Sequence, residues 1–211
     1  MPHVVLLGDS IFDNAAYVAG GQDVVTHLRG ELPDGWKATL SAIDGATTRD
    51  MPIQYGRIPA DATHLVLSVG GNDALMNVDI LERRASSAGE ALWMLADVCD
   101  AFATRYDAVL RDLMGRGLPL TVCTIYEGNF PDARMQRLAA TALTVFNDAI
   151  LRHAIRAGLS VIELRLVCTE PADYANPIEP SVQGGAKIAS AIARAVGANG
   201  DDGPRTEIIA A

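Results

Sequence analysis

Four short polar segments, each following an apolar run, contain residue types that could form a serine-based active site. They are GDSIFDN at 8–14, DGATT at 44–48, GGNDAL at 70–75 and YEGNFPD at 126–132. A serine nucleophile needs an exposed tight turn, and the oxyanion that it creates needs donors aimed at one point. Each segment alone is a weak signal, because glycine, Asx and hydroxyl residues gather in any loop. Their joint occurrence favours a site built around Ser10.

The apolar runs before these segments are short and β-rich, as strands covered on both faces would be. We expect strands at 3–7, 38–43, 65–69, 120–125 and 160–164. Apolar residues recur with a 3.6-residue period between and after them, which predicts helices at 21–32, 87–115, 133–157 and 181–196. Strand and helix therefore alternate along the chain.

Alternation of this kind predicts an α/β fold with a five-stranded, mainly parallel sheet and right-handed crossovers. Open sheets of this type bind ligands beyond the carboxyl ends of their strands, which is where the polar segments would lie. A length of 211 residues suits one ordinary domain. We assign residues 1–197 to that domain and the polar, glycine-rich residues 198–211 to a flexible C-terminal tail.

These motifs resemble those of the SGNH, or GDSL-like, hydrolase family from the first strand to the last helix. The resemblance implies a three-layer, flavodoxin-like α/β/α sandwich. Ser10 in GDS matches the family's nucleophile, Gly45 in DGATT its glycine block and Asn72 in GGND its asparagine block. By the resemblance, the N–H groups of Ser10 and Gly45 and the Asn72 amide form the oxyanion hole. We expect glycine at 45 because it presents its N–H without a Cβ in the way.

The family's fourth block is DxxH ahead of the last helix, and this chain departs from it. The sequence NPIEPS at 176–181 places Asn176 at the aspartate position and Glu179 at the histidine position. Asn176 would orient Glu179 through its amide. A carboxylate base needs no aspartate to fix its tautomer, and asparagine removes a negative charge that would have repelled it.

None of the four histidines is placed to substitute for the missing one. His3 opens the first predicted strand, about 20 Å from Ser10 at 3.3 Å per residue, and His64 opens the third. His27 and His153 belong to predicted helices that return toward the starts of the strands. All four are expected to be structural or surface residues.

Glu179 is therefore the predicted base. An ordinary glutamate has a pKa of about 4.3 against about 6.5 for histidine, a deficit of roughly 3 kcal/mol in taking the serine proton. Burial beside Ile178 would raise the pKa of Glu179, whereas the nearby helix N-terminus would lower it.

Two other interpretations stay open. Both substituted positions could have drifted after catalysis was lost, leaving a binding module in which Ser10 only shapes a loop or caps a helix. Alternatively, acidic side chains at the same edge could hold Mg²⁺ for phosphohydrolysis; they are Asp9, Asp13, Asp44 and Asp73. No phosphate-binding glycine pattern or basic cluster accompanies them. Asp9 and Asp73 are rather expected to support their loops by hydrogen bonds to backbone N–H groups.

Composition limits the class of ligand. Nearly half of the residues are apolar and the formal net charge is −9, without any basic run. Nucleic acid and anionic lipid are therefore poor partners, and a small neutral or cationic molecule is expected. Tyr126, Asn129 and Phe130 follow the fourth predicted strand and could line its pocket.

The remaining features favour a cytoplasmic protein. The amino-terminal stretch lacks the cationic lead and long apolar run of a secretory signal, and no run of some 18 apolar residues follows. Cys99, Cys123 and Cys168 are widely spaced, as reduced thiols would be. The sequence thus predicts a cytoplasmic serine hydrolase for esters of small or medium acyl groups, without metal or cofactor and of unknown oligomeric state.

Overall fold

A five-stranded parallel sheet forms the centre of the computed structural model, which describes residues 1–198 and 208–209. The strands are β1 (His3–Gly8), β2 (Lys37–Leu40), β3 (His64–Ser68), β4 (Leu120–Cys123) and β5 (Ser160–Ile162). Their order across the sheet is β2-β1-β3-β4-β5, and every neighbouring pair is parallel. This is the flavodoxin-like order. The predicted fold class and the five predicted strands are confirmed.

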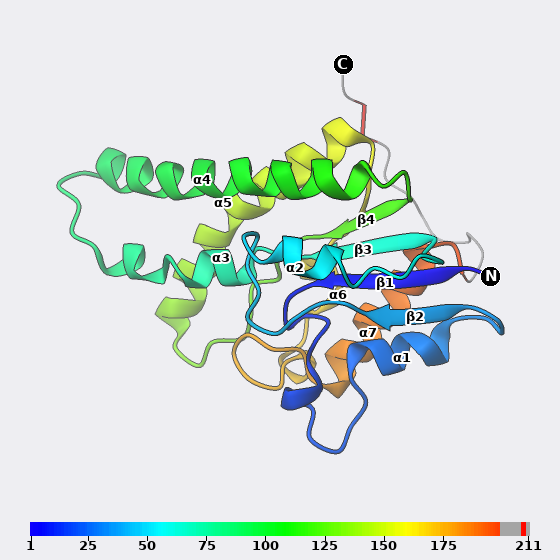
Figure 1. The fold of residues 1–211 in the computed structure, drawn as a ribbon. Coiled ribbons are helices and arrows are strands. Elements are labelled where there is room, and N and C mark those ends of the chain that lie inside the picture. Colours follow the sequence, from blue (N-terminus) through cyan, green and yellow to red (C-terminus); the bar gives the residue numbers. More distant parts are fainter. Residues whose placement is uncertain (199–207, 210–211) are drawn as a thin grey trace.

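Helices cover both faces of the sheet and complete a three-layer sandwich (Figure 1). The long helices are α1 (Val24–Glu31), α4 (Ala88–Met114), α5 (Ala133–Ala157) and α7 (Val182–Ala195). α1 and α7 pack on one face, and α4 and α5 pack on the other. Along β1, Val4 and Leu6 contact the first layer, whereas Val5 and Leu7 contact the second. Burial on both faces explains why β1 reads as a continuous apolar run.

The four long helices match their predictions within a few residues, and each begins at a side chain that caps it. The Ser87 hydroxyl accepts the Glu90 N–H at the start of α4, and the Asp132 carboxylate accepts the Met135 N–H at the start of α5. Shorter helices were missed, because a helical period needs more than one turn to show. They are η1 (Ala15–Tyr17), α2 (Met51–Tyr55), α3 (Gly71–Leu75), η2 (Val78–Glu82), α6 (Leu164–Val167) and η3 (Pro171–Asp173).

The predicted division of the chain at residue 197 is not settled by the fold. Most of the predicted tail, 198–211, lies outside the described residues, so the tail stays a prediction. Within the described part of the chain, no helix has both the length and the apolar character needed to cross a membrane.

Buried amide side chains hold the backbone at the carboxyl ends of two strands. Gln54 of α2 is fully buried, accepts the Gly8 N–H at 2.8 Å and donates to the Gly8 carbonyl at 2.7 Å. Asn147 of α5 accepts the Ile125 N–H at 2.7 Å and donates to the Ile125 carbonyl at 2.8 Å. Backbone groups that leave the sheet inside the protein need such partners. These contacts fix the directions in which the chain leaves β1 and β4.

The amino-terminal halves of α4 and α5 extend past the carboxyl edge of the sheet (Figure 1). All buried residues of α4 lie between Phe102 and Leu113, and all those of α5 lie between Phe146 and Ala154. The first halves of both helices therefore contribute no fully buried residue, and only Val98, Cys99 and Val145 at their inner ends are partly buried against the core. We call these halves, 88–101 of α4 and 133–145 of α5, the overhang.

Gln54→Met should lower the free energy of unfolding by about 2–4 kcal/mol, because each buried backbone group of Gly8 that loses its partner costs about 1–3 kcal/mol. Urea denaturation followed by circular dichroism would measure the change. Gln22→Met is the matched control, since Gln22 is exposed, and should stay within about 0.5 kcal/mol of the wild type. Equal stability of the two variants would contradict this role of Gln54.

Candidate active site

β1 ends in a turn that requires glycine. Gly8 has a φ of 129°, and a Cβ there would lie 1.7 Å from the Ser68 carbonyl oxygen at the end of β3. L-residues rarely adopt this φ, and the backbone of the neighbouring strand leaves no room for a side chain. The Asp9 N–H donates to the same carbonyl at 3.1 Å. The chain thus crosses closely against β3 and brings Ser10 to the carboxyl edge of the sheet.

Ser10 and Glu179 are in hydrogen-bond contact, although 169 positions separate them in the sequence. The Ser10 Oγ donates to Glu179 Oε1 at 3.0 Å. Only 7% of Ser10 and 5% of Glu179 is exposed. The second carboxylate oxygen, Oε2, is buried and has no hydrogen-bond partner within the described residues. A hydroxyl and a carboxylate at this distance can exchange a proton.

A hairpin-like loop between Tyr174 and Pro180 carries Glu179 to the hydroxyl. An antiparallel bridge joins those two residues and closes the loop. From the segment after β4, the buried Tyr126 donates its hydroxyl hydrogen to the Ile178 carbonyl at 2.7 Å. The loop is therefore fixed both at its base and beside Glu179.

Asn176 holds the main chain of this loop. Its Oδ1 accepts the N–H groups of Ile178 at 2.9 Å and of Glu179 at 3.0 Å. In the described part of the chain, no hydrogen bond joins the Asn176 amide to the Glu179 carboxylate, which differs from the expected contact. An asparagine side chain readily binds backbone N–H groups two or three residues further on. Asn176 therefore positions Glu179 through the backbone.

Burial raises the pKa of the Glu179 carboxyl group from 4.5 to about 7. The hydrogen bond from Ser10 opposes this rise, and the negative charge of Asp44 adds to it. Desolvation acts in this direction because it disfavours the charged form. Glu179 also lies before the first residue of α7, whose N-cap is Ser181. At neutral pH Glu179 is thus divided between its charged and neutral forms.

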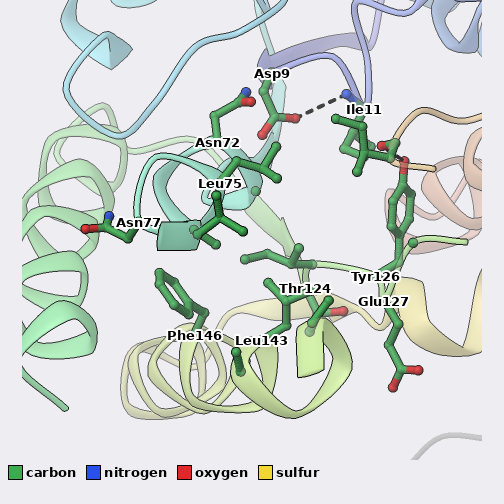
Figure 2. A pocket seen from close by; sticks show the side chains of 18 of the residues that line it. Asp9, Ile11, Asn72, Leu75, Asn77, Thr124, Tyr126, Glu127, Leu143 and Phe146 are labelled. Carbon is green, nitrogen blue, oxygen red and sulfur yellow. Dashed lines mark hydrogen bonds between the residues drawn. The ribbon is translucent and has the colours of Figure 1, made fainter. Parts of the chain in front are cut away.

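Asp9 is a second buried carboxyl group beside Ser10. Its Oδ1 accepts the Ile11 N–H at 3.1 Å (Figure 2). Burial raises the pKa of Asp9 to about 8; the hydrogen bond from Ile11 opposes this rise, and the charges of Glu179 and Asp73 add to it. Asp9 is therefore mostly neutral at pH 7, which leaves Glu179 as the main negative charge at the hydroxyl.

The predicted oxyanion hole includes two backbone N–H groups, those of Ser10 and Gly45. Within the described residues, neither the Ser10 N–H nor the Gly45 N–H donates to a protein acceptor. Gly45 has a φ of 77°, and a Cβ there would meet nothing within 4 Å. The positive φ alone favours glycine at this position, and the predicted access of a ligand to the N–H stays a prediction.

Asn72 connects the loop after β3 to the glycine loop. Its Nδ2 donates to the carbonyl of Ala46, the residue after Gly45, at 3.0 Å. The amide nitrogen carries two hydrogens, so a second N–H remains for a ligand. Asn72 lines the same pocket as Ser10 and Glu179. This placement is compatible with the predicted donor role.

Asp73 lies next to Asn72 and supports the glycine loop from behind. Its Oδ2 accepts the Thr48 N–H at 2.9 Å, and its Oδ1 accepts the Thr48 hydroxyl at 2.6 Å. Arg105 of α4 lies 3.5 Å from the same carboxylate. Sequence reasoning named Asp73 but missed Thr48 and Arg105, because no motif links residues this far apart in the chain.

The histidines lie away from Ser10. His3 and His64 stand at the amino ends of β1 and β3, and His153 lies in the last turns of α5. His27 lies in the middle of α1, where a Cβ added at Gly185 of α7 would meet its ring at 3.7 Å. In the described part of the chain, none of the four hydrogen-bonds to Ser10 or to its carboxylate partner.

The acidic residues do not gather around one point. Asp13 accepts the Asp44 N–H at 2.9 Å, and Asp44 accepts the Tyr17 hydroxyl at 2.7 Å. Asp9 and Asp73 make the separate contacts described above. Among the described residues, no three acidic, cysteine or histidine side chains are close enough together to hold a metal ion. The geometry gives no support to the magnesium alternative.

Ser10 and Glu179 both line a pocket at the carboxyl edge of the sheet. Figure 2 shows other residues that line it, among them Asn72, Leu75 and Phe146. Its walls come from the segments after β1, β3 and β4, from α3 and η2, and from the overhang of α4 and α5. Tyr126 and Phe130 line this pocket, whereas Asn129 does not. The site is therefore a cleft between the sheet edge and two helices that reach beyond it.

Comparison with known families agrees with this geometry. The profile of the GDSL-like lipase/acylhydrolase family matches residues 6–186, most of the chain. The chain belongs to the GDSL-like lipase/acylhydrolase family. No curated protein sequence matches it.

Solved structures of several hydrolases share the fold of this GDSL-like chain at low sequence identity. The extracellular lipase of Streptomyces rimosus matches with a TM-score of 0.66 and 14% identity, over 92% of this chain and 100% of that one. Phospholipase A1 of Streptomyces albidoflavus matches with a TM-score of 0.65 and 15% identity, over 92% of this chain and 98% of that one. A variant of a Geobacillus acetyl-xylooligosaccharide esterase matches with a TM-score of 0.66 and 16% identity, over 92% of this chain and 94% of that one.

Membership in the GDSL-like family makes the chain a serine hydrolase that acts on esters. In this GDSL-like chain, however, the hydroxyl that matches the family's nucleophile contacts a carboxylate. Glu179 is therefore the residue to consider as the base.

Stability should fall as pH rises from about 5 to about 9. The folded-state pKa values of Asp9 and Glu179 are raised to about 8 and about 7, so the folded protein holds protons that the unfolded chain has lost. Asp9→Asn should make the fall shallower in urea denaturation at a series of pH values. Asp34→Asn, at an exposed position, should keep the wild-type slope. An unchanged slope in Asp9→Asn would contradict the raised pKa.

Proposed function

We propose that the protein hydrolyses small-molecule esters of small or medium acyl groups, with Ser10 as nucleophile and Glu179 as general base. The observation that carries this proposal is the 3.0 Å hydrogen bond from Ser10 Oγ to a buried carboxylate in the pocket. The free N–H groups of Ser10 and Gly45 and the second N–H of Asn72 are the proposed oxyanion donors. Such donors act at the charge that develops in the transition state.

Glu179 transfers the proton in both halves of the reaction, acylation and deacylation. Glu179 takes the Ser10 proton while Oγ attacks the ester carbonyl carbon, and the carbonyl oxygen becomes the oxyanion. The protonated Glu179 returns the proton to the alcohol oxygen as its bond to carbon breaks, which leaves an acyl-serine. Water then gives a proton to Glu179 and attacks the acyl carbon. The acid departs, and Ser10 regains its proton.

The raised pKa makes a carboxylate usable in this role. An ordinary glutamate is a weaker base than histidine by about two pKa units, or roughly 3 kcal/mol. Burial raises the pKa of Glu179 to about 7 and so removes this difference from histidine. A general base works best when its pKa lies near the working pH. Asn176 does not need to fix a tautomer, and its contact with the main chain is sufficient to hold the carboxylate in place.

The neutral form of Asp9 also supports the proposal. A second carboxylate beside Ser10 would repel the negative charge of the oxyanion. With a pKa of about 8, Asp9 carries little charge at pH 7.

We also propose a cytoplasmic location, as predicted from the sequence, and cell fractionation would test it.

Ser10→Ala should abolish hydrolysis of p-nitrophenyl acetate and butyrate, and Glu179→Gln should lower kcat by about 10²-fold or more, within the usual range for loss of a general base. Glu127→Gln is the matched control, because Glu127 lines the same pocket without contacting Ser10. Its rates should stay close to wild type. Full activity in Glu179→Gln would remove Glu179 from the mechanism, and equal rates in all variants would indicate a binding protein.

The pH dependence of kcat/KM should follow the ionisation of Glu179. Only the carboxylate can take the serine proton, so the rate should rise with pH and level off above a midpoint near 7. Initial rates with p-nitrophenyl butyrate, corrected for spontaneous hydrolysis, would give the midpoint. A midpoint near 4.5, the ordinary value for glutamate, would mean that burial does not tune this group.

A further inference from the structure

The two loops that carry the proposed oxyanion donors are joined directly to each other. The glycine loop, 44–48, contains Gly45, and the loop after β3 contains Asn72. Asn72 Nδ2 donates at 3.0 Å to the carbonyl of the residue that follows Gly45. One position further along both loops, Asp73 accepts the Thr48 N–H at 2.9 Å and the Thr48 hydroxyl at 2.6 Å. Three hydrogen bonds therefore fix the spacing of the two loops.

A side chain from α4 completes this connection. Arg105 Nε donates to the Thr48 hydroxyl at 3.2 Å, and Arg105 Nη2 lies 3.5 Å from Asp73 Oδ1. A hydroxyl can accept one hydrogen bond and donate another, so Thr48 lies between the guanidinium and the carboxylate. The three side chains form one network that links α4 to both loops.

The carboxylate in this network depends on its cation. The Asp73 side chain is 3% exposed. In the described part of the chain, Arg105 is the only residue that forms an ion pair with it. Removal of one partner from a buried ion pair leaves a charge without compensation, and the surrounding structure must adjust. The groups that would adjust here are the two loops that Asp73 joins.

The same face of α4 contacts the loop after β3 a second time. Phe102 lies three residues before Arg105, so both side chains are on one side of the helix. Phe102 is fully buried, and a Cβ at Gly70 would lie 3.0 Å from its Cζ. An apolar contact and a charged contact thus fix this loop against α4.

Arg105 is separate from the groups that would react. It is not among the described residues that line the pocket, and its hydrogen bonds go to Thr48 and Asp73. An effect of Arg105 on turnover would therefore have to pass through those two residues.

We propose that Arg105 is a positioning residue for the oxyanion hole. Through Thr48 and Asp73 it holds the Gly45 N–H and the Asn72 amide at the spacing that the developing oxyanion requires. This inference rests on the proposed function and adds to it a residue that no sequence motif indicates. Oxyanion donors act at the transition state, so a small displacement lowers kcat more than it weakens substrate binding.

Arg105→Met should lower kcat for p-nitrophenyl butyrate by about 10- to 100-fold while KM stays within about twofold. Arg111→Met is the matched control, because Arg111 lies on the same helix, is 71% exposed and pairs with Asp107. Its kcat should equal that of the wild type. Circular dichroism at the assay temperature would show that both variants are folded. A normal kcat in folded Arg105→Met would overturn the proposal.

A double-mutant cycle tests the route through Thr48. Thr48→Val keeps the shape of the side chain without its hydroxyl and should also lower kcat with little change in KM. The double variant should lose no more than about twofold beyond the larger single loss, because both changes break one network. Ethylguanidine should restore part of kcat in Arg105→Ala but none in Thr48→Val. Additive losses, or no restoration, would contradict the proposal. If Arg105→Met fails to fold, Thr48→Val carries the same kinetic prediction.

A readout without turnover separates this inference from the catalytic proposal. In Arg105→Met, the Thr48 N–H should exchange with solvent at least about tenfold faster, measured by nuclear magnetic resonance. If the wild type does not hydrolyse esters but this exchange is faster, the link from Arg105 to the glycine loop stands and the proposed chemistry fails. If hydrolysis depends on Ser10 but Arg105→Met keeps its kcat, the positioning role fails alone.

Discussion

The contact between Gln54 and Gly8 sets the geometry on which the site depends. A parallel strand that ends inside the protein must turn its backbone away from its neighbours without leaving polar groups unpaired. At Gly8 the neighbouring β3 backbone excludes any side chain, and one buried glutamine binds both the N–H and the carbonyl. Ser10 follows two residues later. Its direction is therefore fixed by the core of the protein and not by the loop to which it belongs.

A second constraint is the low solvation of the carboxyl groups around Ser10. Asp9 and Glu179 are both buried, and the negative charge of Glu179 makes ionisation of Asp9 less favourable. The folded protein accommodates this by holding protons at pH values where exposed carboxyl groups would have lost them. The same burial that costs stability at high pH raises the pKa of Glu179 to about 7. Burial of the same carboxyl groups thus affects both the pH dependence of stability and the pKa of the proposed base.

Much of the scaffold was predictable because its signals are long and repeated. The continuous apolar run of β1 and the 3.6-residue period of α4 and α5 are visible in the sequence, and the edge where Ser10, Gly45 and Asn72 lie follows from the parallel order. α2 was missed because five residues show no period. Gln54 was missed with it, since a buried glutamine looks like any polar helix residue until its partner is known.

The finer features of the site needed three-dimensional contacts. The position of Glu179 next to Ser10 was expected from the family motif. The role of Asn176 depends on how the loop between Tyr174 and Pro180 closes, and there its oxygen accepts main-chain N–H groups. The positive φ of Gly45 is likewise a feature that composition cannot show. The catalytic roles of these residues remain proposals.

In the overhang, the residues that shape the pocket are largely separate from the residues that pack the core. Its apolar positions between 133 and 145 contribute little to the packed core, which on α5 begins at Phe146. Changes there alter the shape offered to a ligand while the sheet and its strand-end contacts stay as they are. Descendants of such a chain can therefore acquire new preferences by exchanging a few half-buried helical residues, at little risk to folding.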